Sequence, residues 1–215
     1  MLQDTLLRRT SRVFSAALNN EHLSEDDKGV LRLQEDDVAA WKVLVFWMFD
    51  KRLPEQDFEF EIGRPEGRED LQALLIHWWV LGDKYAVPEF QDLVMLELLH
   101  HLNKTFLTAT AVELAASLTA PGSKLRAVAA IDIAMAASGN DEKSIDKYER
   151  ALSVVGFACE AVKEIKRDMG IHDGVTCDIG DKSGERRHDR WMKFMVGGGP
   201  GKHWIHQGIP DGSDG

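Results

Sequence analysis

The chain has few cysteines, no long apolar run and no excess of positive charge. Its two cysteines, Cys159 and Cys177, are too few for a disulfide framework in 215 residues. The longest weakly polar stretch, residues 127–137, is too short to span a bilayer and contains Asp132. The N-terminus lacks the continuous apolar segment of a signal peptide. These absences predict a soluble protein of the cytoplasm, the nucleus or both, with no membrane partner.

Negative charge exceeds positive charge along the chain. There are 36 acidic residues against 26 lysines and arginines, which gives a formal net charge of −10. Because neutralising phosphates needs a basic surface, this balance predicts no nucleic-acid partner. Arg8, Arg9 and Arg12 cluster near the N-terminus, and we interpret them as the solvated face of a helix.

The spacing of apolar residues predicts helices throughout the first half. The expected helices cover residues 2–19, a segment from an Asp36 or Asp37 cap to Pro54, a segment from an Asp70 cap to Tyr85, and 88–102. Pro88 suits the first turn of the last helix, so VLGDKYAVPEFQ (80–91) is expected to join two helices. One short strand is expected at Val30–Leu33, with a second extended piece at 58–62.

The second half is expected to be helical up to a glycine-rich tail. The pattern predicts helices at about 123–137 and about 144–169, the second packed against the preceding helices. Its expected buried stripe is Ile145, Tyr148, Leu152, Val155, Cys159 and Val162. Beyond residue 169 lie 11 of the 18 glycines, so we expect little order there apart from WMKFMV (191–196), which could dock.

The sequence contains no motif typical of a catalytic, metal or cofactor site. A Gly-x-Ser-x-Gly turn is absent, and GGGPGK (197–202) lacks the first glycine and the Ser or Thr of a phosphate loop. Cys177, His188, His203 and His206 lack the close cysteine pair of a zinc site. We therefore predict a non-catalytic protein with no metal and no cofactor, in which Asp83 and Lys84 fix a helix end.

Three segments, in this order and spacing, resemble the BTB/POZ domain, in the version abundant in fungal proteins. They are SRVFSAALNNEHLSEDDKGVLRL (11–33), DDVAAWKVLVFWMFDKRLP (36–54) and LLIHWWVLGDKYAVPEFQDLVM (74–95). The matching positions are Ser11, Phe14, Leu33, Asp36, Asp37, Trp47, Phe49, Asp83, Lys84, Tyr85, Pro88 and Phe90. Gly82 stands where the family usually has alanine.

The resemblance implies an α+β, mostly α-helical fold. We expect a BTB/POZ-like helical cluster with a reduced or vestigial β-sheet, followed by extra helices. Because the chain starts almost inside the family's first helix, its first β-hairpin is expected to be missing, by truncation or shortening. The expected divisions are a BTB/POZ-like domain at 1–104, a helical extension at 105–169 and a tail at 170–215.

The resemblance also implies a protein–protein interaction module. Family members commonly dimerise through the first helix, where this chain has Leu6, Leu7, Val13 and Phe14, and the missing strand would weaken that self-association. The alternative is a substrate adaptor of a cullin-based ubiquitin ligase. The hydrophobic-x-Glu element that such adaptors use to contact the cullin scaffold is similar to Leu23-Ser24-Glu25 in this chain.

Overall fold

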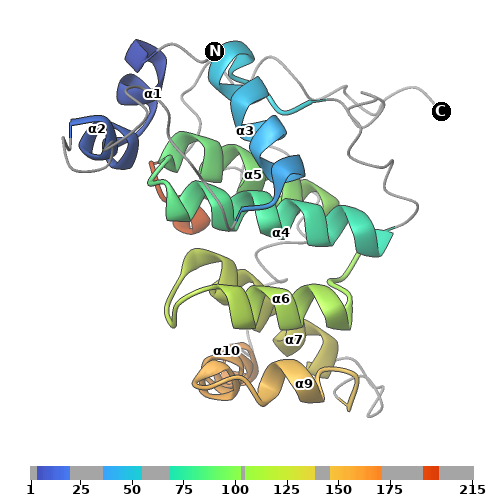
Figure 1. Cartoon of the computed structure of the whole chain (residues 1–215). Coiled ribbons are helices and arrows are strands. Elements are labelled where there is room, and N and C mark those ends of the chain that lie inside the picture. The colour runs from blue at the N-terminus through green and yellow to red at the C-terminus, as the bar shows by residue number, and fades with distance from the viewer. Residues whose placement is uncertain are drawn as a thin grey trace.

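The computed structural model describes residues 4–19, 36–54, 68–102, 105–138, 146–170 and 191–198. These residues are mostly α-helical and include no strand, so the mostly helical part of the predicted fold class is confirmed. The expected strand at Val30–Leu33 and the extended piece at 58–62 lie outside the described residues. The described helices form two groups, with α1 to α5 above α6, α7, α9 and α10 in Figure 1.

The N-terminal helix expected at 2–19 is two helices, α1 (Asp4–Thr10) and α2 (Arg12–Asn19). They are separated at Ser11, whose Oγ accepts hydrogen bonds from the backbone N–H groups of Val13 (3.0 Å) and Phe14 (3.3 Å). The prediction of one helix was wrong because this serine caps a new helix, as short polar side chains do when they compete with the helical ladder.

Helix α3 (Val38–Asp50) begins at the expected aspartates and ends earlier than expected. Asp37 is the cap, since its Oδ1 accepts the Ala39 N–H at 2.8 Å. The helix ends before Lys51, which has a φ of 57° in the left-handed region, and it does not reach Pro54. The buried face comprises Ala40, Val43, Leu44, Trp47 and Met48, whereas Val38 is exposed and does not belong to the core.

The joint between α4 (Arg68–Lys84) and α5 (Pro88–Leu102) confirms the expected start of a helix at Pro88. Asp70 lies within α4 and is not its cap. At the other end of α4, Ala86 has a φ of 49°, its N–H donates to the Asp83 carbonyl, and the Val87 N–H donates to the Gly82 carbonyl. This pair of bonds is a Schellman motif, with alanine in the position that glycine usually takes.

The second half contains α6 (Ala109–Leu118), capped by Thr108, and α7 (Lys124–Ser138), which matches the helix expected at 123–137. The long helix expected at 144–169 is broken into α9 (Glu149–Leu152) and α10 (Phe157–Gly170). Gly156 lies between them with a φ of 81°, a conformation that a regular helix cannot contain.

The break at Gly156 also invalidates the predicted buried stripe from Val155 onward, whereas Leu152 before the break packs against the core and Ile145 lies outside the described residues. Val155 is 88% exposed, and Cys159, which we expected in the core, is exposed as well. Tyr148 is buried as expected, but α10 packs through Phe157 and Ala161. The positions after the break were wrong because the turn at Gly156 rotates α10 relative to the continuous helix that the residue spacing had predicted.

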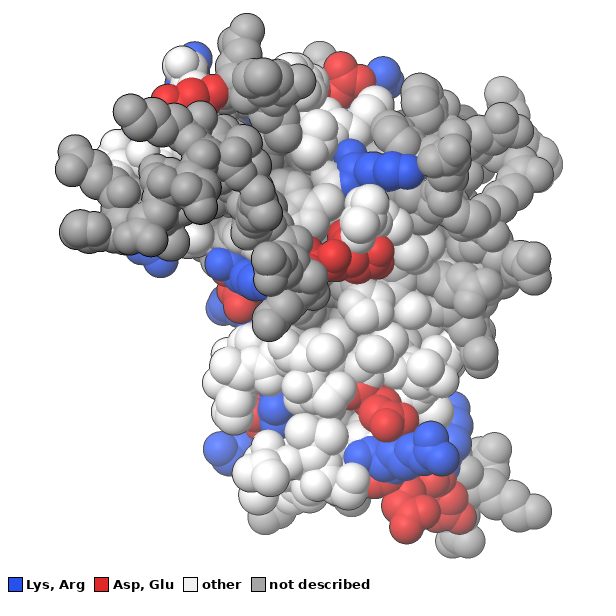
Figure 2. Space-filling view, in the orientation of Figure 1, with Lys and Arg blue, Asp and Glu red and all other residues white. Residues whose placement is uncertain are grey.

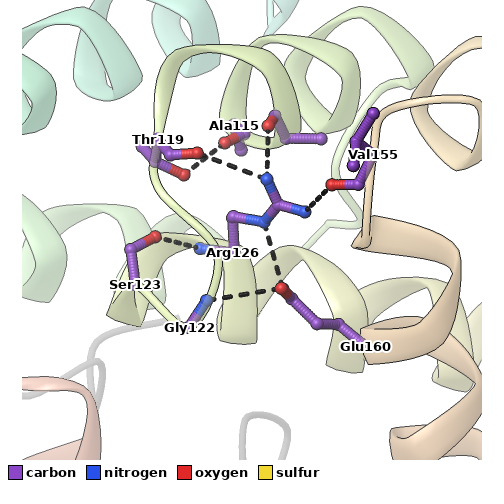
Figure 3. A network of polar contacts seen from close by, with 8 residues as sticks. Ala115, Thr119, Gly122, Ser123, Arg126, Val155 and Glu160 are labelled. Atoms are coloured by element: carbon purple, nitrogen blue, oxygen red, sulfur yellow. Dashed lines mark hydrogen bonds and ion pairs between the residues drawn. The ribbon is translucent and has the colours of Figure 1, made fainter.

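Arg126 on α7 ties the end of α6 to the turn between α9 and α10 (Figure 3). Its side chain is 2% exposed, and Nη1 donates to the carbonyls of Ala116 (2.9 Å) and Thr119 (3.3 Å). Nη2 donates to the Val155 carbonyl at 3.2 Å, and Nε donates to Glu160 Oε2 at 3.1 Å. One buried guanidinium thus donates hydrogen bonds to backbone carbonyls at and beyond helix ends, where no intrahelical N–H partner exists.

The face of the molecule shown in Figure 2 carries charges of both signs. Acidic and basic side chains lie side by side in the region of α9. The exposed charged residues in this helix and just before it are Asp146, Lys147, Glu149 and Arg150. The described residues in this view form no extended basic patch. Within the described parts of the chain, no helix is long and apolar enough to cross a membrane.

Candidate functional site

The carboxylate of Asp36 joins segments that are far apart in the sequence. Its Oδ1 lies 2.6 Å from Lys84 Nζ, and its Oδ2 accepts hydrogen bonds from Trp41 Nε1 (3.0 Å) and from the Tyr85 hydroxyl. The Asp36 side chain is only 6% exposed. Three donors from the start of α3 and the end of α4 therefore meet one nearly buried anion.

Three aromatic rings pack beside this carboxylate. Phe14 and Tyr85 stack with their centroids 4.9 Å apart, and Trp41 meets the Tyr85 ring edge-on, also at 4.9 Å. The Ser11 hydroxyl donates to the backbone carbonyl of Tyr85, so α2 is held to the same place. We call this cluster the Asp36 junction, and it consists of Ser11, Phe14, Asp36, Trp41, Lys84 and Tyr85.

The electrostatics of the junction favour one protonation state. Burial by itself would raise the pKa of Asp36, but hydrogen bonds from Lys84, Tyr85 and Trp41, with the charge of Lys84, hold that pKa below its ordinary value. Burial raises the pKa of Tyr85, and the hydrogen bond to Asp36 and the negative charge of Asp36 raise it further. At neutral pH the junction therefore contains a carboxylate and a neutral phenol.

This arrangement suits a structural joint better than acid–base chemistry. The Asp36 carboxylate already accepts from three donors, and a carboxylate with a lowered pKa is a weak base. Tyr85 holds its proton more tightly than an ordinary tyrosine. The joint expected for Asp83 and Lys84 is present, because Asp83 Oδ1 accepts from Gln91 Nε2 at 3.2 Å. Lys84, however, pairs with Asp36 of a distant segment.

The residues expected to mediate self-association do not lie together on the surface. Phe14 is fully buried in the Asp36 junction, so its side chain is enclosed within one chain. Leu6 and Leu7 are half-buried and pack against the core, and Val13 is 37% exposed. Of the four, Val13 is the most exposed. Leu23, Ser24 and Glu25 lie outside the described residues.

Sequence reasoning named Asp36 as an alternative helix cap and as a position of the BTB/POZ resemblance, but it predicted none of its contacts. The signal that could have shown more is the pair Asp36-Asp37, because one N-cap position needs one side chain and leaves the other for a different partner. Arg126 was also missed. Its signal was a lone arginine in a run of alanine, valine and isoleucine, where an unpaired charge would be costly to bury.

The described residues contain no group of three or more histidine, cysteine, aspartate or glutamate side chains that could hold a metal ion. Cys177, His188, His203 and His206, considered as ligands from the sequence, lie outside those residues. Comparison of the chain with protein families, with curated proteins and with solved structures found no match.

Proposed function

We propose that the chain is a non-catalytic protein–protein interaction module of the BTB/POZ type. The observation that supports this is the Asp36 junction. The three segments that carry the resemblance each supply side chains to it: Ser11 and Phe14 from the first, Asp36 and Trp41 from the second, Lys84 and Tyr85 from the third. Three short sequence matches whose residues contact one another in the folded chain support the resemblance more strongly than three matches with no contacts between them.

The chemistry of the junction also supports a binding role. Its polar groups are paired with one another, so they stabilise the arrangement of α2, α3 and α4 and have little capacity left for a substrate. Helices fixed to one another in this way can present their outer side chains in a constant arrangement, which favours binding of a partner.

The test is co-purification in a fixed ratio. A tagged full chain, expressed in a fungal cell, would be eluted gently and its mass measured by light scattering. We expect a complex heavier than the 24.1 kDa single chain, containing either a second copy or a different protein in constant ratio. A lone monomer in repeated isolations at the cellular concentration would contradict the proposal.

A cullin scaffold is the more specific partner that the resemblance implies. In that role Leu23 would supply an apolar anchor and Glu25 a carboxylate at the rim of the contact. Replacing both by alanine should abolish pull-down of the scaffold, while Ser24→Ala should not. Equal pull-down by the double variant and the original chain would exclude this motif as the contact and would leave other protein partners open.

A further inference from the structure

Residues 191–198 lie against the helical body although residues 171–190 separate them from the end of α10. They form a short 3-10 turn, η2 (Met192–Phe194), drawn in red beside the α4–α5 layer in Figure 1. Trp191 is 1% exposed, and Phe194 and Met195 are buried too, whereas Met192 and Val196 remain exposed. Two aromatic anchors three residues apart therefore enter the body, and the side chain next to the first anchor faces solvent.

A buried carboxylate on α5 recognises the backbone of this segment. Asp92 is 1% exposed, its Oδ1 accepts the Val196 N–H, and its Oδ2 accepts the Gly197 N–H at 2.9 Å. Hydrogen bonds of a backbone N–H to an ionised carboxylate are stronger than neutral ones. Asp92 therefore binds two successive backbone N–H groups, and this contact requires no particular side chain at position 196.

Two further contacts hold the segment at its sides. The ring of His100 on α5 meets the Trp191 ring edge-on with centroids 4.8 Å apart. Lys124 Nζ, at the start of α7, donates to the carbonyl of Lys193 at 2.7 Å. Both contacts fix the path of the chain, and the second, like that of Asp92, is made to a backbone group. The surface formed by α5 and the first turn of α7 thus recognises an anchored peptide.

Gly197 adds selectivity for a small residue after the anchors. A Cβ at this position would lie 3.1 Å from Asp92 Oδ2 and 3.1 Å from Pro88 Cβ. Pro88 is at the first turn of α5 and has little room to move. A residue larger than glycine would therefore push against the Asp92 carboxylate that the segment needs and against a proline that has little room to give.

From these contacts we infer that α5 and the start of α7 form a binding site for a short peptide of the pattern Trp-x-x-Phe-Met-x-Gly. The chain fills this site with its own residues 191–197. A partner that competes for the site must present two aromatic anchors followed by a buried methionine, two consecutive backbone N–H groups and a glycine. This inference does not depend on the resemblance to BTB/POZ domains.

The test uses the full-length chain with Trp191→Ala and Phe194→Ala, which empties the site. A fluorescent synthetic peptide of residues 189–199 should bind this double variant saturably in an anisotropy titration. Binding to the original chain, whose site is filled, should be at least about tenfold weaker. Adding Asp92→Asn to the double variant, or Gly197→Val to the peptide, should each weaken binding by about tenfold or more, because each disturbs the same pair of N–H contacts.

Absence of saturable binding to a folded double variant, or equal binding of the Gly197→Val peptide, would overturn the inference. If the double variant does not fold, the original full-length chain with a protease site inserted within 171–190 serves instead. After cleavage the C-terminal fragment should stay bound in gel filtration, and excess synthetic peptide should displace it. A fragment that separates at once, or that excess peptide cannot displace, would also overturn the inference.

Discussion

The hydroxyl of Tyr85 donates a hydrogen bond to the carboxylate of Asp36, a residue 49 positions earlier in the chain. Through this bond the joint between α4 and α5 is fastened to the start of α3, and Ser11 fastens α2 to the same tyrosine through its backbone carbonyl. GDKY (82–85), which has the residue types of a catalytic cluster, is thus a polar joint between helices.

Replacement of Asp36 by alanine should destabilise the fold by about 2 to 4 kcal/mol, because the buried Tyr85 hydroxyl loses its acceptor at a cost of about 1 to 3 kcal/mol and the half-buried Trp41 N–H loses its acceptor at about 1 kcal/mol. Urea unfolding followed by tryptophan fluorescence measures the change. Asp37→Ala is the matched control, since it removes only the cap of α3 and should cost about 1 kcal/mol. Equal effects of the two variants would contradict the role given to Asp36.

The stability that the junction supplies should depend on pH in two windows. Because the pKa of Asp36 is lowered in the folded chain, its contribution is present above the ordinary value of 3.8 and is lost as the pH falls through the folded pKa. Because the pKa of Tyr85 is raised, its contribution is present below the ordinary value of 10.0 and declines as the pH rises above it.

Comparing the original chain with a variant that cannot titrate at the position separates each contribution from those of other titrating groups. The difference in unfolding free energy between the original chain and Asp36→Asn should shrink as the pH is lowered from 5 towards 2. The difference from Tyr85→Phe should shrink as the pH is raised from 9 towards 11. Differences that stay constant across both ranges would show that neither group titrates as the junction requires.

Gly82 is explained by the packing of Gln91. A Cβ at Gly82 would lie 2.7 Å from Gln91 Cγ and 3.1 Å from Phe90 Cδ1. Gly82→Ala should therefore cost about 1 kcal/mol net, since overpacking of about 1 to 3 kcal/mol outweighs a helix-propensity gain of about 1 kcal/mol.

A double-mutant cycle tests this explanation. In a Gln91→Ala background, Gly82→Ala should become neutral or stabilising, with a coupling of about 1 kcal/mol or more between the two sites. The same cost of Gly82→Ala with and without Gln91 would rule out the proposed clash.

Arg126 should be among the most sensitive positions of the second half. Arg126→Ala should cost roughly 3 to 5 kcal/mol, the range for breaking a buried ion pair, since several carbonyls and Glu160 lose their donor together. Arg126→Lys keeps the charge but lacks the planar fork, so it should recover only part of the loss. Glu160→Gln is the control with a smaller effect, because Glu160 is partly exposed. Thermal unfolding of the three variants in parallel distinguishes these outcomes.

The sequence predicted the parts of the fold that follow from periodicity. The helix expected at 88–102 is present as α5, and its residues Phe90, Val94, Leu98 and Leu102, which recur every four residues, are buried in the core. The helix at 123–137 was expected for the same reason and is present as α7. Spacing was sufficient here because no residue in these segments competes with the helical backbone.

Spacing failed where one residue breaks the helix. Ser11 and Gly156 each divide a segment that was expected to be continuous, and after Gly156 every buried position was assigned to the wrong face. The site was missed for a different reason. Two of the three partners of Asp36, Lys84 and Tyr85, lie 48 and 49 residues away, and periodicity within one segment carries no information about contacts over such distances.

The central claim, that residues 1–104 form a protein-binding module, is tested most directly by cross-linking mass spectrometry of the affinity-purified full chain. Lysines lie in both halves, with Lys51 and Lys84 exposed in the first and Lys124, Lys147 and Lys163 exposed in the second, so either half can report a contact. We predict that cross-links to the partner concentrate on the lysines of residues 1–104. A partner cross-linked only through residues 105–169, or no partner in constant ratio, would contradict the claim.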